Sequence, residues 1–193
     1  MTRRSSLWYR PWPLVPARIL LTDYAYTAIL GLVVESLFEG LEMAFLLVGN
    51  GGPRTFVAER IVNHKELVRA GCIREQTRDK VVAIFTQEAL ATFAGSQYLI
   101  LGHTHNQGHF LGAVPSSARK LYPQEPGRKM DEEYSQCEGF TGFVCDIDRR
   151  SREPLMATGF MGHRHITVFA KGQCITPDIW KLLMEEMKKT RTY

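Results

Sequence analysis

The segment 98–109, with the sequence YLILGHTHNQGH, restricts the fold of this chain more than any other stretch. An apolar run ends at Gly102, and His103 and His105 follow at once. If the strand continues through them, its period of two places both imidazoles on one face. Two neutral imidazoles that converge from one strand end can bind a divalent metal ion. An isolated His-x-His pair is as often ordinary polar surface, so the rest of the chain must decide between the two.

The composition is that of an ordinary soluble globular domain. The chain has 193 residues, which suits one domain and allows a substantial buried core. Hydrophobic residues make up 45% of it and charged residues 23%, as is typical of globular proteins. The net charge of +4 is mild, and no basic stripe interleaved with aromatic residues follows any expected element. We therefore expect no nucleic-acid partner.

The cysteines and the apolar runs give further expectations. Cys72, Cys137, Cys145 and Cys174 are far apart and form no Cys-x-x-Cys pair. They predict reduced thiols in a cytoplasmic protein, without a structural zinc knuckle. The best apolar run, 25–34, is too short to span a bilayer and is followed by glutamates. We therefore expect no membrane segment.

Hydrophobic periodicity and capping signals predict a mixed series of strands and helices. The expected strands are 18–21, 42–49, 55–62, 80–85, 97–101, 141–147, 155–161 and 166–170. The expected helices are 23–40, 86–95, 130–136 and a final amphipathic helix from Thr176. Residues 1–17 are predicted to form an extended arm, and 64–79 and 113–129 to be irregular. The order indicates an α/β or α+β domain over residues 18–193, with a mixed β-sheet flanked by helices.

Taken together, these features resemble the JAB/MPN domain, the zinc metalloprotease group also called JAMM, which has a cytidine-deaminase-like architecture. By element order the resemblance covers roughly residues 18–171. It rests on Glu42 before an apolar strand and on Gly102-His103-Thr104-His105 at a strand end. It also rests on the segment 115–117 (PSS) and on 143–146 (FVCD) as the strand after the site. The family pattern is a glutamate, then His-x-His, then a serine and an aspartate that opens a helix.

The resemblance implies a zinc-dependent isopeptidase that cleaves after the C-terminus of ubiquitin or a ubiquitin-like protein. In the family, two histidines and an aspartate hold one Zn²⁺, so His103 and His105 are the expected ligands. Zinc with three protein ligands lowers the pKa of a water in the fourth position to about 7. The glutamate, here Glu42, takes the proton of that water and returns it to the leaving amine. Ser116 or Ser117 would supply the hydroxyl that stabilises the oxyanion.

The third ligand departs from the family pattern. The family places the aspartate three residues after the serine, where this chain has Arg119, and a guanidinium offers no acceptor for a metal. Prolines and a glycine within 123–127 prevent a helix from starting there, whereas 130–134 can begin one. We therefore predict a lengthened loop with Asp131 as the third ligand. The alternatives are that Asp131 is an ordinary acid in the first turn of a helix and that His109 is a weaker substitute ligand.

Two other functional classes remain open. One is a catalytically silent MPN scaffold, which Arg119 in the aspartate position would favour. The other is a calcineurin-like phosphoesterase, whose last metal motif resembles 102–105. Such an enzyme needs two metals and several earlier ligands, but this chain has no Asp-x-His, and Gly49-Asn50-Gly51 lacks the histidine of an Asn-His pair. Metal content separates them: one zinc for the peptidase, two metals for the phosphoesterase and none for the scaffold. His163 and His165 form a second His-x-His, predicted to be half-buried strand residues because no acid lies near them in the sequence.

The expected partners follow from the resemblance as well. They are conjugates of ubiquitin or a ubiquitin-like protein, together with a protein partner or a second copy of the chain. The irregular segments 64–79 and 113–129 are where the tail of a protein substrate would be held. Which ubiquitin-like protein is cleaved, and whether the bond is an isopeptide or a linear fusion, is left open by the sequence.

Overall fold

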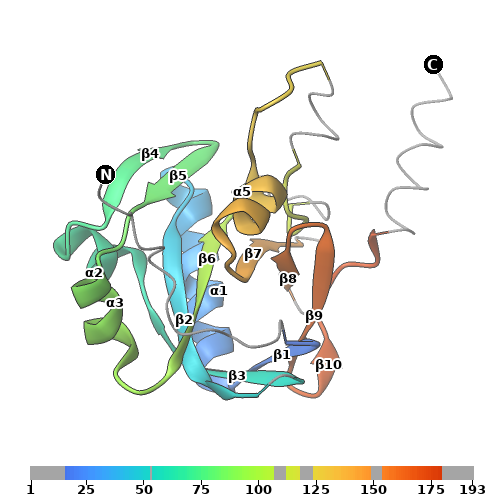
Figure 1. Cartoon of the computed structure of the whole chain (residues 1–193). Coiled ribbons are helices and arrows are strands. Elements are labelled where there is room, and N and C mark those ends of the chain that lie inside the picture. The colour runs from blue at the N-terminus through green and yellow to red at the C-terminus, as the bar shows by residue number, and fades with distance from the viewer. Residues whose placement is uncertain (1–15, 53, 107–111, 118–123, 149–153, 180–193) are drawn as a thin grey trace, which may run out of the picture.

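The computed structural model describes residues 16–52, 54–106, 112–117, 124–148 and 154–179. Its fold is mixed α+β, as predicted (Figure 1). The described helices are α1 (Asp23–Glu39), α2 (His64–Arg69), α3 (Gln87–Ala94) and α5 (Asp131–Glu138). The described strands are β1 (Arg18–Leu21), β2 (Ala44–Gly51), β3 (Thr55–Val62), β4 (Ile73–Thr77), β5 (Lys80–Ala83), β6 (Tyr98–Thr104), β7 (Gly142–Ile147), β8 (Leu155–Met161), β9 (Arg164–Ala170) and β10 (Gln173–Cys174).

The main sheet has eight strands in the order β1-β3-β2-β6-β7-β8-β9-β10. Strand β1 pairs in parallel with β3 on one side and with β9 on the other. This double pairing closes the sheet on itself. The sequence correctly predicted a mixed sheet with helices against it, but not its closure. The sequence of a four-residue strand indicates only which of its side chains are buried. It does not identify a partner strand far along the chain.

Strand β2 lies at the centre of the structure and is buried on both faces. Phe45 and Leu47 pack in a core cluster with the inner side of α1. Leu46 and Val48 face a second cluster, which lies under α2 and α3 on the opposite side of the sheet (Figure 1). Burial on both faces explains why this segment is a continuous apolar run rather than an alternating one.

Local capping explains why α1 has the predicted ends. The Thr22 hydroxyl accepts a hydrogen bond from the Ala25 N–H at 3.2 Å and so satisfies a free donor of the first turn. Gly40 ends the helix in the left-handed conformation, with φ of 68°. That conformation favours glycine, and the Gly40 N–H donates to the carbonyl of Ser36.

The prediction that residues 64–79 are irregular is wrong. The segment contains α2 and β4, and β4 pairs with β5 as a separate two-stranded hairpin. Helix α2 begins with a capping box, in which Asn63 and Glu66 each accept the other's backbone N–H, at 3.0 and 2.8 Å. This signal, an asparagine followed three residues later by a glutamate, is visible in the sequence.

Other expectations concern the chain as a whole. All four cysteines are unpaired. Within the described residues, none of the helices has the length and apolar character needed to cross a membrane. The predicted arm 1–17 and the predicted helix from Thr176 lie almost entirely outside the described residues.

Candidate metal centre

Strand β6 delivers the two histidines side by side. Gly102 lies against the ring of Phe45, where an added Cβ would come within 2.5 Å of the ring carbons. The next inward residue, Thr104, is buried and accepts a hydrogen bond from the Met43 N–H at 3.0 Å. His103 and His105 therefore project together, with ring centroids 5.1 Å apart. The period of two predicted this arrangement.

Asp131, the first residue of α5, completes a cluster with these histidines. The two Nε2 atoms are 3.2 Å apart. The Asp131 carboxylate oxygens lie 3.5 Å from Nε2 of His103 and 3.7 Å from Nε2 of His105. Ligand atoms around a tetrahedral zinc ion are separated by about 3.4 Å, since zinc bonds to nitrogen and oxygen are about 2.1 Å long. His103, His105 and Asp131 could therefore hold a metal ion.

A backbone carbonyl sets the tautomer of His105. Its Nδ1 is hydrogen-bonded to the carbonyl oxygen of Gly112. Because a carbonyl only accepts, Nδ1 carries the proton and Nε2 keeps its lone pair for a metal. At Gly112 an added Cβ would collide with the carboxylate of Asp146, so only glycine allows the loop to approach this closely.

Ser116 holds the carboxylate of Asp131 in place. Both its backbone N–H and its hydroxyl lie 2.8 Å from Oδ2 of Asp131. Its carbonyl accepts the N–H of Glu132 at 3.1 Å. The structure thus brings Ser116 and Asp131 together across the long loop, at the start of a helix close to the predicted one. The role of Ser116 as an oxyanion donor stays a prediction, and Arg119 and His109 lie outside the described residues.

Glu42 lies just before β2 and is held by the β4–β5 hairpin. Its N–H donates to the carbonyl of Thr77 at 3.0 Å, and its own carbonyl accepts from Nε2 of Gln76 at 2.9 Å. The residue is only 8% exposed. Burial raises the pKa of its carboxyl group, while the two histidines of the cluster lower it and Asp131 adds to the rise. A carboxylate with a raised pKa is suited to accept a proton near neutral pH.

The cluster stabilises an added positive charge. Burial disfavours the charged form of His103, but Asp131 and then Glu42 outweigh it and raise its pKa to about 9. Burial favours the neutral form of Asp131, but His103 and His105 hold the pKa of this carboxyl well below its usual value. When no metal ion is bound, His103 therefore carries a proton, and this proton supplies the positive charge that a metal ion would supply.

Metal affinity should consequently rise with pH. Below about pH 9 the metal-free protein carries a proton on His103, which binding must expel. We expect the dissociation constant for Zn²⁺ to fall by up to about tenfold per pH unit between pH 6.5 and 8.5, and to level off above about pH 9. Competition titrations with a chelating indicator would measure this. An affinity that does not change over this range would contradict the expectation that metal binding expels a proton from His103.

The second His-x-His pair has an acidic neighbour that the sequence did not predict. The buried carboxylate of Glu132 contacts Nδ1 of His163 and lies 3.5 Å from Nε2 of His165. His165 is half-buried in β9, as predicted, but His163 is exposed and lies in the turn before this strand. Glu132 is more than thirty positions away in the sequence, so no local spacing could have revealed the contact.

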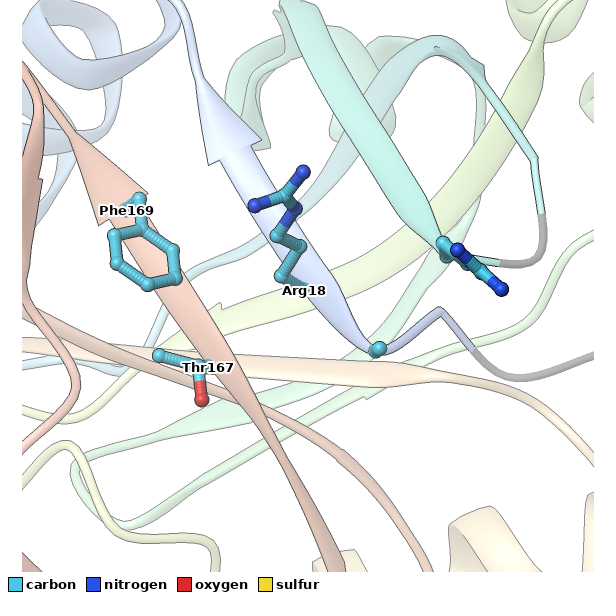
Figure 2. A pocket seen from close by; sticks show the side chains of 5 residues that line it. Arg18, Thr167 and Phe169 are labelled. Carbon is cyan, nitrogen blue, oxygen red and sulfur yellow. The ribbon is translucent and has the colours of Figure 1, made fainter.

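A separate hollow of about 450 Å³ lies at the other end of the sheet (Figure 2). It is lined by Ala17, Arg18, Arg54, Thr167 and Phe169. Arg18 is in register with Thr55, beside the last residues of β2, whereas the histidines lie beside its first residues. The hollow is therefore not part of the metal centre.

Comparison with known proteins adds no assignment. No family model matches this chain, and no curated protein matches it either.

Proposed function

We propose that this chain is a zinc-dependent isopeptidase that cleaves after the C-terminus of ubiquitin or a ubiquitin-like protein. One observation carries the proposal. The buried carboxylate of Glu42 lies close enough to His103, His105 and Asp131 to interact with them electrostatically. A metal-binding group and a proton acceptor in one place are the two components that metal-assisted hydrolysis requires.

The chemistry of the donor atoms favours zinc. Two imidazole nitrogens and one carboxylate oxygen form a set that suits Zn²⁺ better than Ca²⁺ or Mg²⁺, which prefer oxygen ligands alone. Three protein ligands leave a fourth position open, as in catalytic rather than structural zinc sites. The Gly112 carbonyl and Ser116 act as outer partners that orient a histidine and the aspartate.

The proposed reaction is hydrolysis of an amide bond. A zinc ion in this site would lower the pKa of a water there to about 7 and polarise the scissile carbonyl. Glu42 accepts a proton from the attacking water while the oxygen of that water bonds to the carbonyl carbon. Glu42 then donates this proton to the leaving nitrogen as the carbon–nitrogen bond breaks. One water is consumed, and a carboxylate and an amine are released.

The substrate class follows from the resemblance to JAB/MPN proteases, and the surroundings of Glu42 are compatible with it. The tip of the β4–β5 hairpin lies at the edge of the site, where the Arg78 carbonyl accepts a hydrogen bond from the Asn106 side chain at 2.8 Å. This hairpin and the segment 112–117 border Glu42 and Asp131. An extended protein tail could lie between them with its terminal amide at the cluster.

The test combines metal content with hydrolysis. Protein purified without chelator should contain one zinc per chain and cleave amide-linked C-terminal conjugates of ubiquitin or ubiquitin-like proteins. Chelation should abolish cleavage, and added Zn²⁺ should restore it. Zinc-free protein without hydrolysis would instead support a silent scaffold, and two metals per chain a phosphoesterase.

A further inference from the structure

Glu132 is a fully buried carboxylate one residue beyond Asp131. Its side chain reaches away from the metal cluster and contacts His163 in the turn between β8 and β9 and His165 in β9. Its backbone N–H binds the carbonyl of Ser116. One residue therefore joins the start of α5 to two other parts of the chain.

A buried carboxylate is costly unless it is paired and hydrogen-bonded. Replacing a buried ion pair with well-packed apolar groups is often neutral or stabilising. Stability alone therefore does not explain a glutamate at this position. What a carboxylate provides, and an apolar side chain does not, is a hydrogen bond of fixed direction.

That direction matters because of the geometry of the first turn of α5. Successive side chains on a helix point about 100° apart, so Asp131 faces the histidines of β6 while Glu132 faces the β8–β9 turn. Ser135 lies one turn further along the same side as Glu132 and accepts the Gly162 N–H at 2.6 Å. Figure 1 shows α5 lying against this hairpin. Two polar contacts along one side fix the rotation of α5 about its axis.

We propose that Glu132 is a positioning residue of the metal centre, which acts through His163 to hold α5 in the rotation that keeps Asp131 on His103 and His105. The inference rests on the proposed function only in taking Asp131 as a metal ligand. Glu132 itself is not among the residues that could hold the metal ion, and its carboxylate contacts His163 and His165 instead.

The decisive variant is Glu132→Leu, which keeps the buried volume but removes the directional contact. We expect its zinc affinity to fall about 10–100-fold, as for other residues that orient a ligand, with the fold retained by circular dichroism. Glu132→Gln keeps an acceptor for His163 and should stay within about threefold of the wild type. Glu138→Ala, an exposed glutamate of the same helix, is the matched control and should bind as the wild type does.

Two further measurements separate positioning from a general structural role. In an Asp131→Ala background, Glu132→Leu should cause no additional loss of affinity, because the residue it positions is absent. With Co²⁺ as the probe, Glu132→Leu should change the visible absorption of the bound ion, whereas Glu138→Ala should not.

His163→Ala removes the same contact from the hairpin side and should also lower zinc affinity. If one of these two variants fails to fold, the other still tests the positioning role.

The outcomes distinguish this inference from the proposed function. A wild-type chain that binds no zinc would overturn both. Wild-type binding together with unchanged affinity in Glu132→Leu and His163→Ala would overturn the positioning role alone.

Discussion

Glu42→Gln should retain zinc and the fold while losing turnover by about 10²–10⁴-fold. The amide has nearly the shape of the carboxylate, so the hydrogen bonds of the backbone to Thr77 and Gln76 should persist. What the variant lacks is a group that can accept a proton from water. The measurement is kcat on an amide-linked conjugate, with the zinc content of the same sample.

The matched control is Glu39→Gln, which changes an exposed glutamate at the end of α1. It should leave both turnover and zinc content unchanged. Undiminished hydrolysis by Glu42→Gln would remove Glu42 from the chemistry and leave the metal group without its proton acceptor.

Asp131→Ala should lower zinc affinity as much as His105→Ala does, by at least about 100-fold in each case. Two neutral imidazoles alone hold zinc weakly, and either substitution leaves only two protein ligands. The comparison is best made by competition titration, with zinc content of the purified variants as a second readout.

Arg119→Ala is the control for this comparison. Arg119 occupies the position that the family spacing gives to the aspartate, but its guanidinium cannot bind a metal. Zinc affinity should therefore be unchanged. Full zinc content in Asp131→Ala would mean that another acid or His109 completes the site.

The parts of the fold that local sequence controls could be predicted well. Helix α1 has both of its expected ends because Thr22 and Gly40 act within one turn of the residues that they cap. The proposed third ligand could be placed at the start of a helix for the same reason, since the prolines before it exclude an earlier start. His103 and His105 needed only the period of two along one strand.

Contacts made across the chain could not be predicted in this way. Gln76 meets Glu42, and Glu132 meets His163, only after separate elements have packed together. The Gly112 carbonyl that orients His105 is a backbone atom, which every residue possesses, so the sequence carries no mark of its role. These supporting contacts were therefore missed, whereas the meeting of His103, His105 and Asp131 in one group was predicted.

Closure of the sheet makes folding depend on a strand that is made late in synthesis. Strand β1 is made long before β9, yet Arg18 pairs with Thr167 and Leu21 with Ala170. Parallel pairing over so long a separation is slow, because the loop must close before the contact contributes stability. Until β9 has been made, one edge of β1 has no strand beside it and can pair with another chain. A nascent chain that stalls after β8 is therefore prone to aggregation, whereas a completed chain covers this edge.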